Sequence, residues 1–206
     1  MYRSVRGEAN TERVIEKSRF LTYVSHAKGG EEARAFLSRV RGEHPLATHV
    51  CWAYVADKIG NEQRFSDDGE PQGTAGMPIL GVIKAQKLFE TAVAVVRYFG
   101  GIKLGAGGLT RAYAGCASEG LSAAKICEYD GCVELKITVN YPETDSLVRF
   151  LEGRALLGRE FSAQASFTVA VREREKEGFV RELLDRLSGR AKIEEIKRYD
   201  YPFSID

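Results

Sequence analysis

The chain has 206 residues, of which 44% are hydrophobic and 29% are charged, and its formal net charge is +1. This length and balance predict a globular protein of one large or two small domains, and they exclude a protein that coats nucleic acid over its whole surface. The beginning of the chain is polar, and no run approaches the ~18 apolar residues of a membrane span, so we expect a cytoplasmic protein without membrane contact.

The four cysteines lack the close paired spacing of a zinc site, and they are too few to stabilise a chain of this length by disulfides. We therefore expect reduced thiols, with a redox or metal pair of Cys127 and Cys132 as the alternative. No metal and no cofactor is expected from this pattern. The four positions are Cys51, Cys116, Cys127 and Cys132.

The first 130 residues alternate between strand and helix patterns. A long final helix is expected to turn one face inward, because small and apolar residues recur there at steps of three and four. Arg111 falls on the other face of that helix, in its first turn. In chain order we expect strands at 18–27 and 48–57, with a helix at 31–44 between them, a polar turn at 66–71, a helix at 76–88, a central strand at 91–99 and the final helix after a glycine loop. The inward residues of that helix are Leu109, Ala112, Tyr113, Cys116, Ala117, Gly120, Leu121 and Ala124.

The pattern changes near residue 130, where the dipeptide Asp130-Gly131 predicts a turn and a domain boundary. Residues 131–206 then follow the order β-α-β-β-α-β, which is typical of a ferredoxin-like domain. The sequence thus predicts an α+β protein with domains at 1–130 and 131–206.

A glycine-rich segment from Gly100 to Gly108 follows the apolar strand and precedes the final helix. Glycines before a helix N-terminus leave the backbone N–H groups accessible to an anion, and nearby cations add charge-assisted donors. Between Lys84 and Arg111 there are five basic residues and one acidic residue, Glu90. The spacing is neither that of a P-loop nor a dinucleotide fingerprint. The predicted phosphate- or RNA-binding residues are Arg97, Gly100, Gly101, Lys103, Gly105, Gly107, Gly108 and Arg111. The alternative is that the glycines serve tight turns and close packing.

A second polar loop lies at 64–78. Its carboxylates suit a hard cation or proton transfer, but a solvated turn has the same composition and is favoured. Thr74 and the neighbouring glycines are expected to cap the next helix and to leave free N–H groups. The two loops are expected to converge on one face. The residues singled out here are Ser66, Asp67, Asp68, Glu70 and Thr74.

No known catalytic set is recognisable, so the catalytic residues remain unknown and an enzyme is the less favoured hypothesis. His26, His44 and His49 are interpreted as structural, although His44 and His49 flank a turn that is able to face the site.

The stretches "RFSDDGEPQGTAGMPIL" and "VVRYFGGIKLGAGGLTRAY" resemble the paired motifs of the IMPACT family, and the resemblance extends over the whole chain. It implies an N-terminal IMPACT domain that is similar to the second domain of the small-subunit ribosomal protein numbered five. It also implies a C-terminal domain similar to domain V of elongation factor G. Two positions depart from the family pattern: Gln72 stands where Ser is expected, and Val96 where Thr is expected.

The resemblance suggests contact with RNA or the ribosome, because eukaryotic members regulate translation by inhibiting the activation of an amino-acid-starvation kinase. Those members carry an extra N-terminal domain, so the kinase role is not transferred. Two main hypotheses follow, and a regulator that binds only protein remains as a third alternative. In the favoured one, a monomer or weak dimer binds RNA or ribosome phosphates through the basic glycine loop. In the other, an enzyme acts on a small phosphorylated molecule, with a carboxylate as base or metal ligand.

Overall fold

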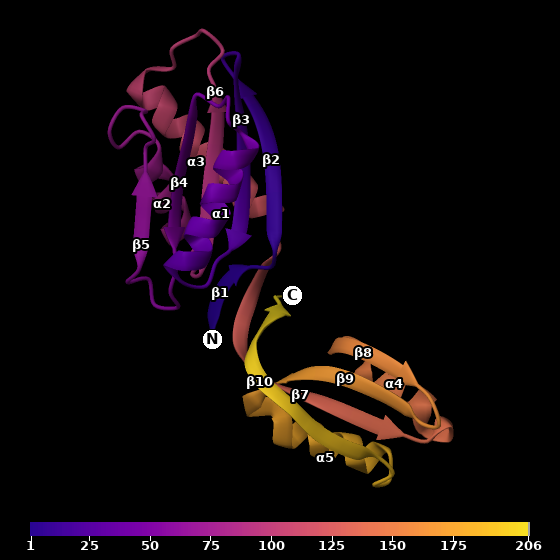
Figure 1. The fold of residues 1–206 in the computed structure, drawn as a ribbon. Coiled ribbons are helices and arrows are strands. Elements are labelled where there is room, and N and C mark those ends of the chain that lie inside the picture. Colours follow the sequence, from indigo (N-terminus) through magenta and orange to yellow (C-terminus); the bar gives the residue numbers. More distant parts are fainter. Residues whose placement is uncertain (206) are drawn as a thin grey trace. The chain divides into compact units, whose positions relative to one another are not determined.

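The computed structural model describes residues 1–205 and divides into two compact units, Tyr2–Glu128 and Tyr129–Phe203 (Figure 1). Both are mixed α and β structures with antiparallel sheet pairings, which agrees with the predicted α+β class. Over the described residues, no helix is both long and apolar enough to cross a membrane.

The first unit is built on a five-stranded sheet in which every pairing is antiparallel. Its order is β2 (Glu8–Ile15), β3 (Ser18–His26), β6 (Thr91–Tyr98), β4 (His49–Val55) and β5 (Gln63–Ser66). The apolar β6 lies at the centre, as its uninterrupted hydrophobic run predicts.

Helices cover both faces of this sheet (Figure 1). Helix α1 (Gly29–Glu43) packs on the face that carries Ala92, Ala94 and Val96. Helices α2 (Gly76–Ala85) and α3 (Gly105–Ala123) pack on the opposite face. Every residue of the predicted inward face of α3 is buried, whereas Arg111 is exposed, so this expectation is confirmed.

The second unit follows the predicted order β-α-β-β-α-β. Its sheet places β7 between β10 and β9, and β8 lies beyond β9. A separate core of aliphatic and phenylalanine side chains lies between this sheet and its two helices. The elements are β7 (Ile126–Val139), α4 (Thr144–Leu151), β8 (Ala155–Phe161), β9 (Ala165–Arg172), α5 (Lys176–Arg186) and β10 (Lys192–Ser204), with 3-10 turns at Tyr141–Glu143 and Glu173–Glu175.

Two features differ from the sequence-based expectation. The predicted turn at Asp130-Gly131 is wrong, because both residues lie inside the continuous strand β7. The Asp130 carboxylate is held there by Arg172 on β9, with 3.2 Å between Nη1 and Oδ2, so the side chain is used in the sheet rather than in a turn. Strands β1 (Tyr2–Val5), β2 and β5 were not predicted, because their sequences carry few apolar residues.

All four cysteines are free and buried. Burial raises the pKa of each thiol, to about 12 for Cys51 and about 11 for Cys116 and Cys127. A protonated, buried thiol is a poor nucleophile and a poor metal ligand, and this environment fits the expectation of reduced thiols.

Candidate functional site

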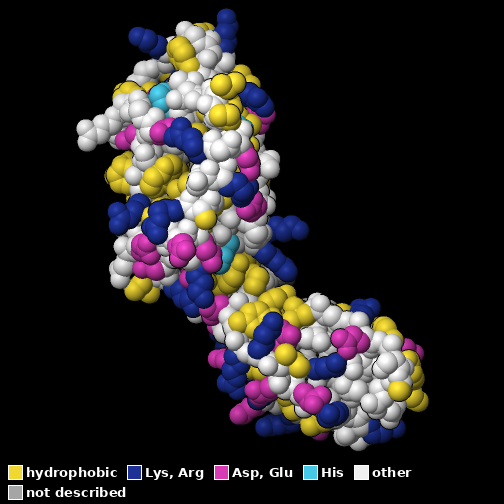
Figure 2. All heavy atoms as spheres, in the orientation of Figure 1, with side chains coloured by type: hydrophobic (Ala, Val, Ile, Leu, Met, Phe, Trp, Pro, Cys, Tyr) yellow, Lys and Arg dark blue, Asp and Glu magenta, His cyan; other side chains and the backbone are white. Residues whose placement is uncertain are grey.

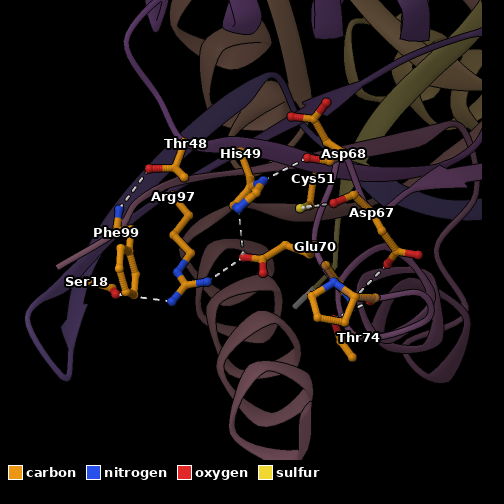
Figure 3. A network of polar contacts seen from close by, with 12 residues as sticks. Ser18, Thr48, His49, Cys51, Asp67, Asp68, Glu70, Thr74, Arg97 and Phe99 are labelled. Atoms are coloured by element: carbon orange, nitrogen blue, oxygen red, sulfur yellow. Dashed lines mark hydrogen bonds and ion pairs between the residues drawn. The ribbon is translucent and has the colours of Figure 1, made fainter. Parts of the chain in front are cut away.

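The two sequence motifs meet at a buried ion pair (Figure 3). Glu70 from the polar loop accepts a hydrogen bond from Nη1 of Arg97, at the end of β6, at 2.6 Å. The same oxygen, Oε1, accepts a second bond from the Tyr113 hydroxyl on α3 at 2.7 Å. The expected convergence of the two loops agrees with a cavity that Glu70 and Pro71 line together with Lys103 and Leu104. The Glu70 carboxylate itself binds residues that flank the glycine-rich segment on either side.

Arg97 differs in its surroundings from the phosphate ligand that its sequence position suggests. Only 4% of the residue is exposed, and its guanidinium lies 5.4 Å from the ring centres of both Phe20 and Phe99. Nη2 donates to the Ser18 hydroxyl at 3.3 Å. Because Glu70 already balances its charge, Arg97 holds the Glu70 carboxylate in position and is not available as a free cation for a ligand.

Asp67 occupies the N-terminus of α2. Its carboxylate accepts hydrogen bonds from the backbone N–H groups of Gly73 at 2.8 Å, Ala75 at 3.0 Å and Gly76 at 2.8 Å. Burial alone would raise the pKa of Asp67, but these three donors outweigh it and lower the pKa below the ordinary value. The expectation that Thr74 caps this helix is wrong, because its hydroxyl donates to the Pro71 carbonyl at 2.6 Å. The N–H groups expected to be free are occupied by Asp67.

Asp68 ties the polar loop to β4. Its Oδ2 accepts the Val50 N–H at 2.6 Å and contacts the Arg41 guanidinium, while its own N–H donates to the Ser66 hydroxyl at 3.1 Å. The three acidic residues of the loop therefore all have protein partners. Among residues 1–205, no group of three or more His, Cys, Asp or Glu side chains is placed to hold a metal ion.

His49 faces the buried pair. Its Nδ1 lies 2.8 Å from the Asp68 carbonyl oxygen, which only accepts, so Nδ1 carries a proton. In the neutral ring Nε2 is then an acceptor, and it lies 3.9 Å from Oε1 of Glu70.

The glycine-rich segment is only partly a loop, because α3 begins at Gly105 and includes Gly107 and Gly108. Three of the glycines have clear structural reasons. A Cβ atom on Gly100 would lie 2.0 Å from the backbone of Lys17 in the β2–β3 turn, and Gly101 and Gly105 have φ +87° and +71°. The interpretation that the glycines serve tight turns and close packing is therefore supported at these three positions.

A cationic groove lies beside the start of α3. Its volume is about 540 Å³, and its lining includes Arg13 on β2, Glu16, Lys103 and Arg111. Within the described part of the chain, neither Lys103 nor Arg111 forms an ion pair or a side-chain hydrogen bond, and Arg13 is 3.9 Å from Glu119. Figure 2 shows Lys and Arg side chains projecting at the end of the first unit where the loop after β6 lies in Figure 1. The charged side chains that line the groove therefore sum to a positive charge.

A second cavity, of about 420 Å³, adjoins the loop after β6. His49, Glu70 and Arg97 line it together with apolar residues, and it shares Lys103 and Leu104 with the cationic groove. We call it the Glu70 pocket. Its full lining is Thr48, His49, Glu70, Pro71, Arg97, Phe99, Lys103, Leu104, Gly105, Ala106 and Leu109.

Four of these site residues did not stand out in the sequence. Arg13 lies on the unpredicted strand β2, and Tyr113 was assigned to the helix core although its hydroxyl reaches Glu70. Phe99 is 44% exposed next to the glycine loop. The one sequence feature that indicated a role in the site was the position of an aromatic residue directly before that loop. His49 was interpreted as structural, and only its position at the helix-to-strand turn indicated the site.

Comparison with known proteins identifies the chain. The model of the Impact N-terminal domain matches residues 16–121. An IMPACT family member of Haemophilus influenzae is 40% identical over 190 residues, which cover 89% of this chain and 91% of that protein. The chain belongs to the IMPACT family.

Other relatives agree with this assignment. The IMPACT family member YigZ of Escherichia coli is 50% identical over 109 residues, which cover 52% of this chain and 53% of that protein. A crystal structure described as that of a hypothetical protein matches 95% of this IMPACT chain and 97% of its own, with a TM-score of 0.61 and 32% identity. The resemblance that the paired motifs indicated is therefore confirmed.

Proposed function

We propose that this IMPACT protein is a translation-associated binding protein that contacts RNA phosphates through the cationic groove at the start of α3. The observation that carries the proposal is the pair Lys103 and Arg111, two cations that line one groove and have no partner among residues 1–205. Unpaired cations beside a helix N-terminus favour an anion, since the first N–H groups of the helix and its dipole add to their field.

The arrangement favours phosphate contact over base reading. The groove offers ammonium, guanidinium and N–H donors, and these fix a backbone without reading sequence. Glu16 is the one acidic residue in its lining, so the groove remains positive. In the wider proposal, residues 1–130 form a domain similar to the second domain of the small-subunit ribosomal protein numbered five, and residues 131–206 form a ferredoxin-like domain similar to domain V of elongation factor G. A pairing of this kind fits a ribosomal partner and a cytoplasmic location.

The first test is the salt dependence of binding. Fluorescence anisotropy with a labelled single-stranded RNA should give a log affinity that falls linearly with log salt concentration, with a slope of about −0.7 per phosphate contacted. An affinity that does not change with salt would place any RNA contact on another surface.

The second test separates the groove from the general charge of the domain. Lys103→Ala should weaken RNA binding by about 1 to 3 kcal/mol, the scale of a charge-assisted hydrogen bond, and change the free energy of unfolding by no more than about 0.5 kcal/mol. Lys84→Ala is the matched control, because Lys84 is exposed on α2 outside the groove. Equal losses in both variants would contradict the proposal.

The enzyme hypothesis gains less support from the site. Asp67 and Asp68 are held by backbone donors, and burial raises the pKa of Cys51 and Tyr113, so these groups are poor bases or nucleophiles in their present environment. A binding function requires no such group.

A further inference from the structure

The Glu70 pocket contains two hydrogen-bond acceptors that no described residue satisfies. Oε1 of Glu70 accepts bonds from Arg97 and Tyr113, but Oε2 accepts none. In the neutral ring, Nε2 of His49 is the second acceptor, because Nδ1 donates to the Asp68 carbonyl. The two side chains approach to 3.9 Å between Nε2 and Oε1. A ligand that places two donors side by side would satisfy both groups.

The charge of the pocket favours neutral donors over a cation. The Glu70 carboxylate is already paired with Arg97 at 2.6 Å, and Lys103 lines the rim of the same pocket. An ammonium group would therefore be repelled by Arg97 and Lys103, whereas hydroxyl groups carry no such penalty.

The rest of the pocket suits a ligand in which a flat apolar ring is linked to an anionic group. Phe99 is 44% exposed and lines the pocket beside Pro71 and Leu104. Lys103 belongs to both the pocket and the cationic groove, so a group bound in the pocket lies next to the phosphate-binding surface. The volume of about 420 Å³ is in the usual range for a pocket that encloses a small molecule.

We infer that the Glu70 pocket binds the 3′-terminal nucleoside of an RNA strand and recognises its 2′- and 3′-hydroxyls through Glu70 and His49. The base stacks on Phe99, the two hydroxyls donate to Oε2 of Glu70 and Nε2 of His49, and the 5′-phosphate of the same nucleotide contacts Lys103. The 2′-hydroxyl distinguishes RNA from DNA, so the pocket gives the protein a preference for RNA. This inference rests on the proposed phosphate-binding function, and it adds a sugar specificity that phosphate contacts alone do not provide.

The first measurement uses the unaltered protein. Anisotropy titrations compare a 5′-labelled single-stranded RNA with 5′-labelled DNA of the same sequence and with its 2′-O-methyl RNA form, at one salt concentration. We expect the RNA to bind about five- to tenfold more tightly than both, because each loses a hydroxyl donor.

The second measurement uses two variants. His49→Asn keeps an N–H group near the position of Nδ1 and removes the Nε2 acceptor, so RNA affinity should fall to that of DNA while DNA affinity stays unchanged. Phe99→Ala should weaken RNA and DNA binding alike, by about tenfold, because stacking on a ring does not depend on the sugar. Phe161→Ala is the matched control, since Phe161 is an exposed phenylalanine on β8 of the other unit. Thermal unfolding verifies that each variant is folded.

The outcomes separate this inference from the proposed function. Equal affinity for RNA and DNA in the unaltered protein, with Lys103→Ala still weakening both, overturns the nucleoside pocket and leaves phosphate binding in place. A His49→Asn variant that is folded and keeps the full RNA preference also overturns it. Absence of binding to either nucleic acid overturns the proposed function and this inference together.

Discussion

The polar loop at 66–76 and the glycine-rich segment at 100–108 contribute to one site in opposite ways. In the first, all three acidic side chains are held by protein donors. In the second, the Lys103 side chain has no partner among the described residues. The acidic residues, for which the sequence left a solvated turn or a cation site open, build the framework, and the cations of the glycine-rich side remain available to a ligand. A polar side chain becomes a candidate ligand-binding group only after its partners within the fold have been counted.

The largest effect is expected when the ion pair between Glu70 and Arg97 is broken. Arg97→Met leaves the Glu70 carboxylate buried without its cation, so the free energy of unfolding should fall by about 3 to 5 kcal/mol in urea denaturation. Arg41→Met is the control, because Arg41 pairs with Asp68 at a half-exposed position and should cost less than about 1 kcal/mol. Similar losses in the two variants would show that the buried pair is not the anchor of the site.

The second prediction concerns Asp67, another acidic residue of the polar loop. Asp67→Ala removes the acceptor of three N–H groups at the start of α2 and should cost about 2 to 3 kcal/mol at neutral pH. Because the folded pKa of Asp67 lies below the ordinary value of 3.8, its contribution is complete above that pH and is lost as the pH falls through the folded pKa.

Urea unfolding of both proteins at a series of pH values tests this sign. The difference between the unaltered protein and Asp67→Ala should shrink as the solution is made more acidic than about pH 4. A difference that stays constant to about pH 2 would mean that the carboxylate charge contributes nothing.

The smallest effects distinguish the glycines of the other segment. Gly105 has φ +71°, so Gly105→Ala should destabilise the fold by about 1 kcal/mol or slightly more. Gly107 lies in the first turn of α3 without a positive φ, and a Cβ there would be 3.5 Å from Nη1 of Arg111, an ordinary contact. Gly107→Ala should therefore stabilise the helix by up to about 1 kcal/mol, and thermal unfolding of the pair tests the opposite signs.

Elements with strong periodicity were predictable from the sequence. The apolar run of β6 and the small-residue face of α3 carry their own signals, because burial on a sheet selects residues at a fixed spacing. Strand β2 was not predictable, since it pairs only with β3 at the edge of the sheet and tolerates charged residues on both faces.

The sequence indicated which segments form the candidate site, but it did not indicate which side chains in them bind one another. Lys103 and Arg111 were indicated by local charge next to glycines, and they line the groove. The roles of Glu70 and Asp67 were not, because their partners lie at a distance along the chain that no local pattern encodes. Asp67 reaches N–H groups six to nine residues ahead, and Glu70 reaches Arg97 across 27 positions.

The ion pair between Glu70 and Arg97 also has a consequence for how such sequences diverge. A mutation at either position alone leaves a charge buried and unpaired, and a lineage that carries it loses stability before any new function is gained. Tyr113 shares the same carboxylate oxygen, so a third position on α3 is subject to the same constraint. The two motifs are therefore coupled at this pair, and we expect a substitution of Glu70 to be tolerated only with a matching change at Arg97.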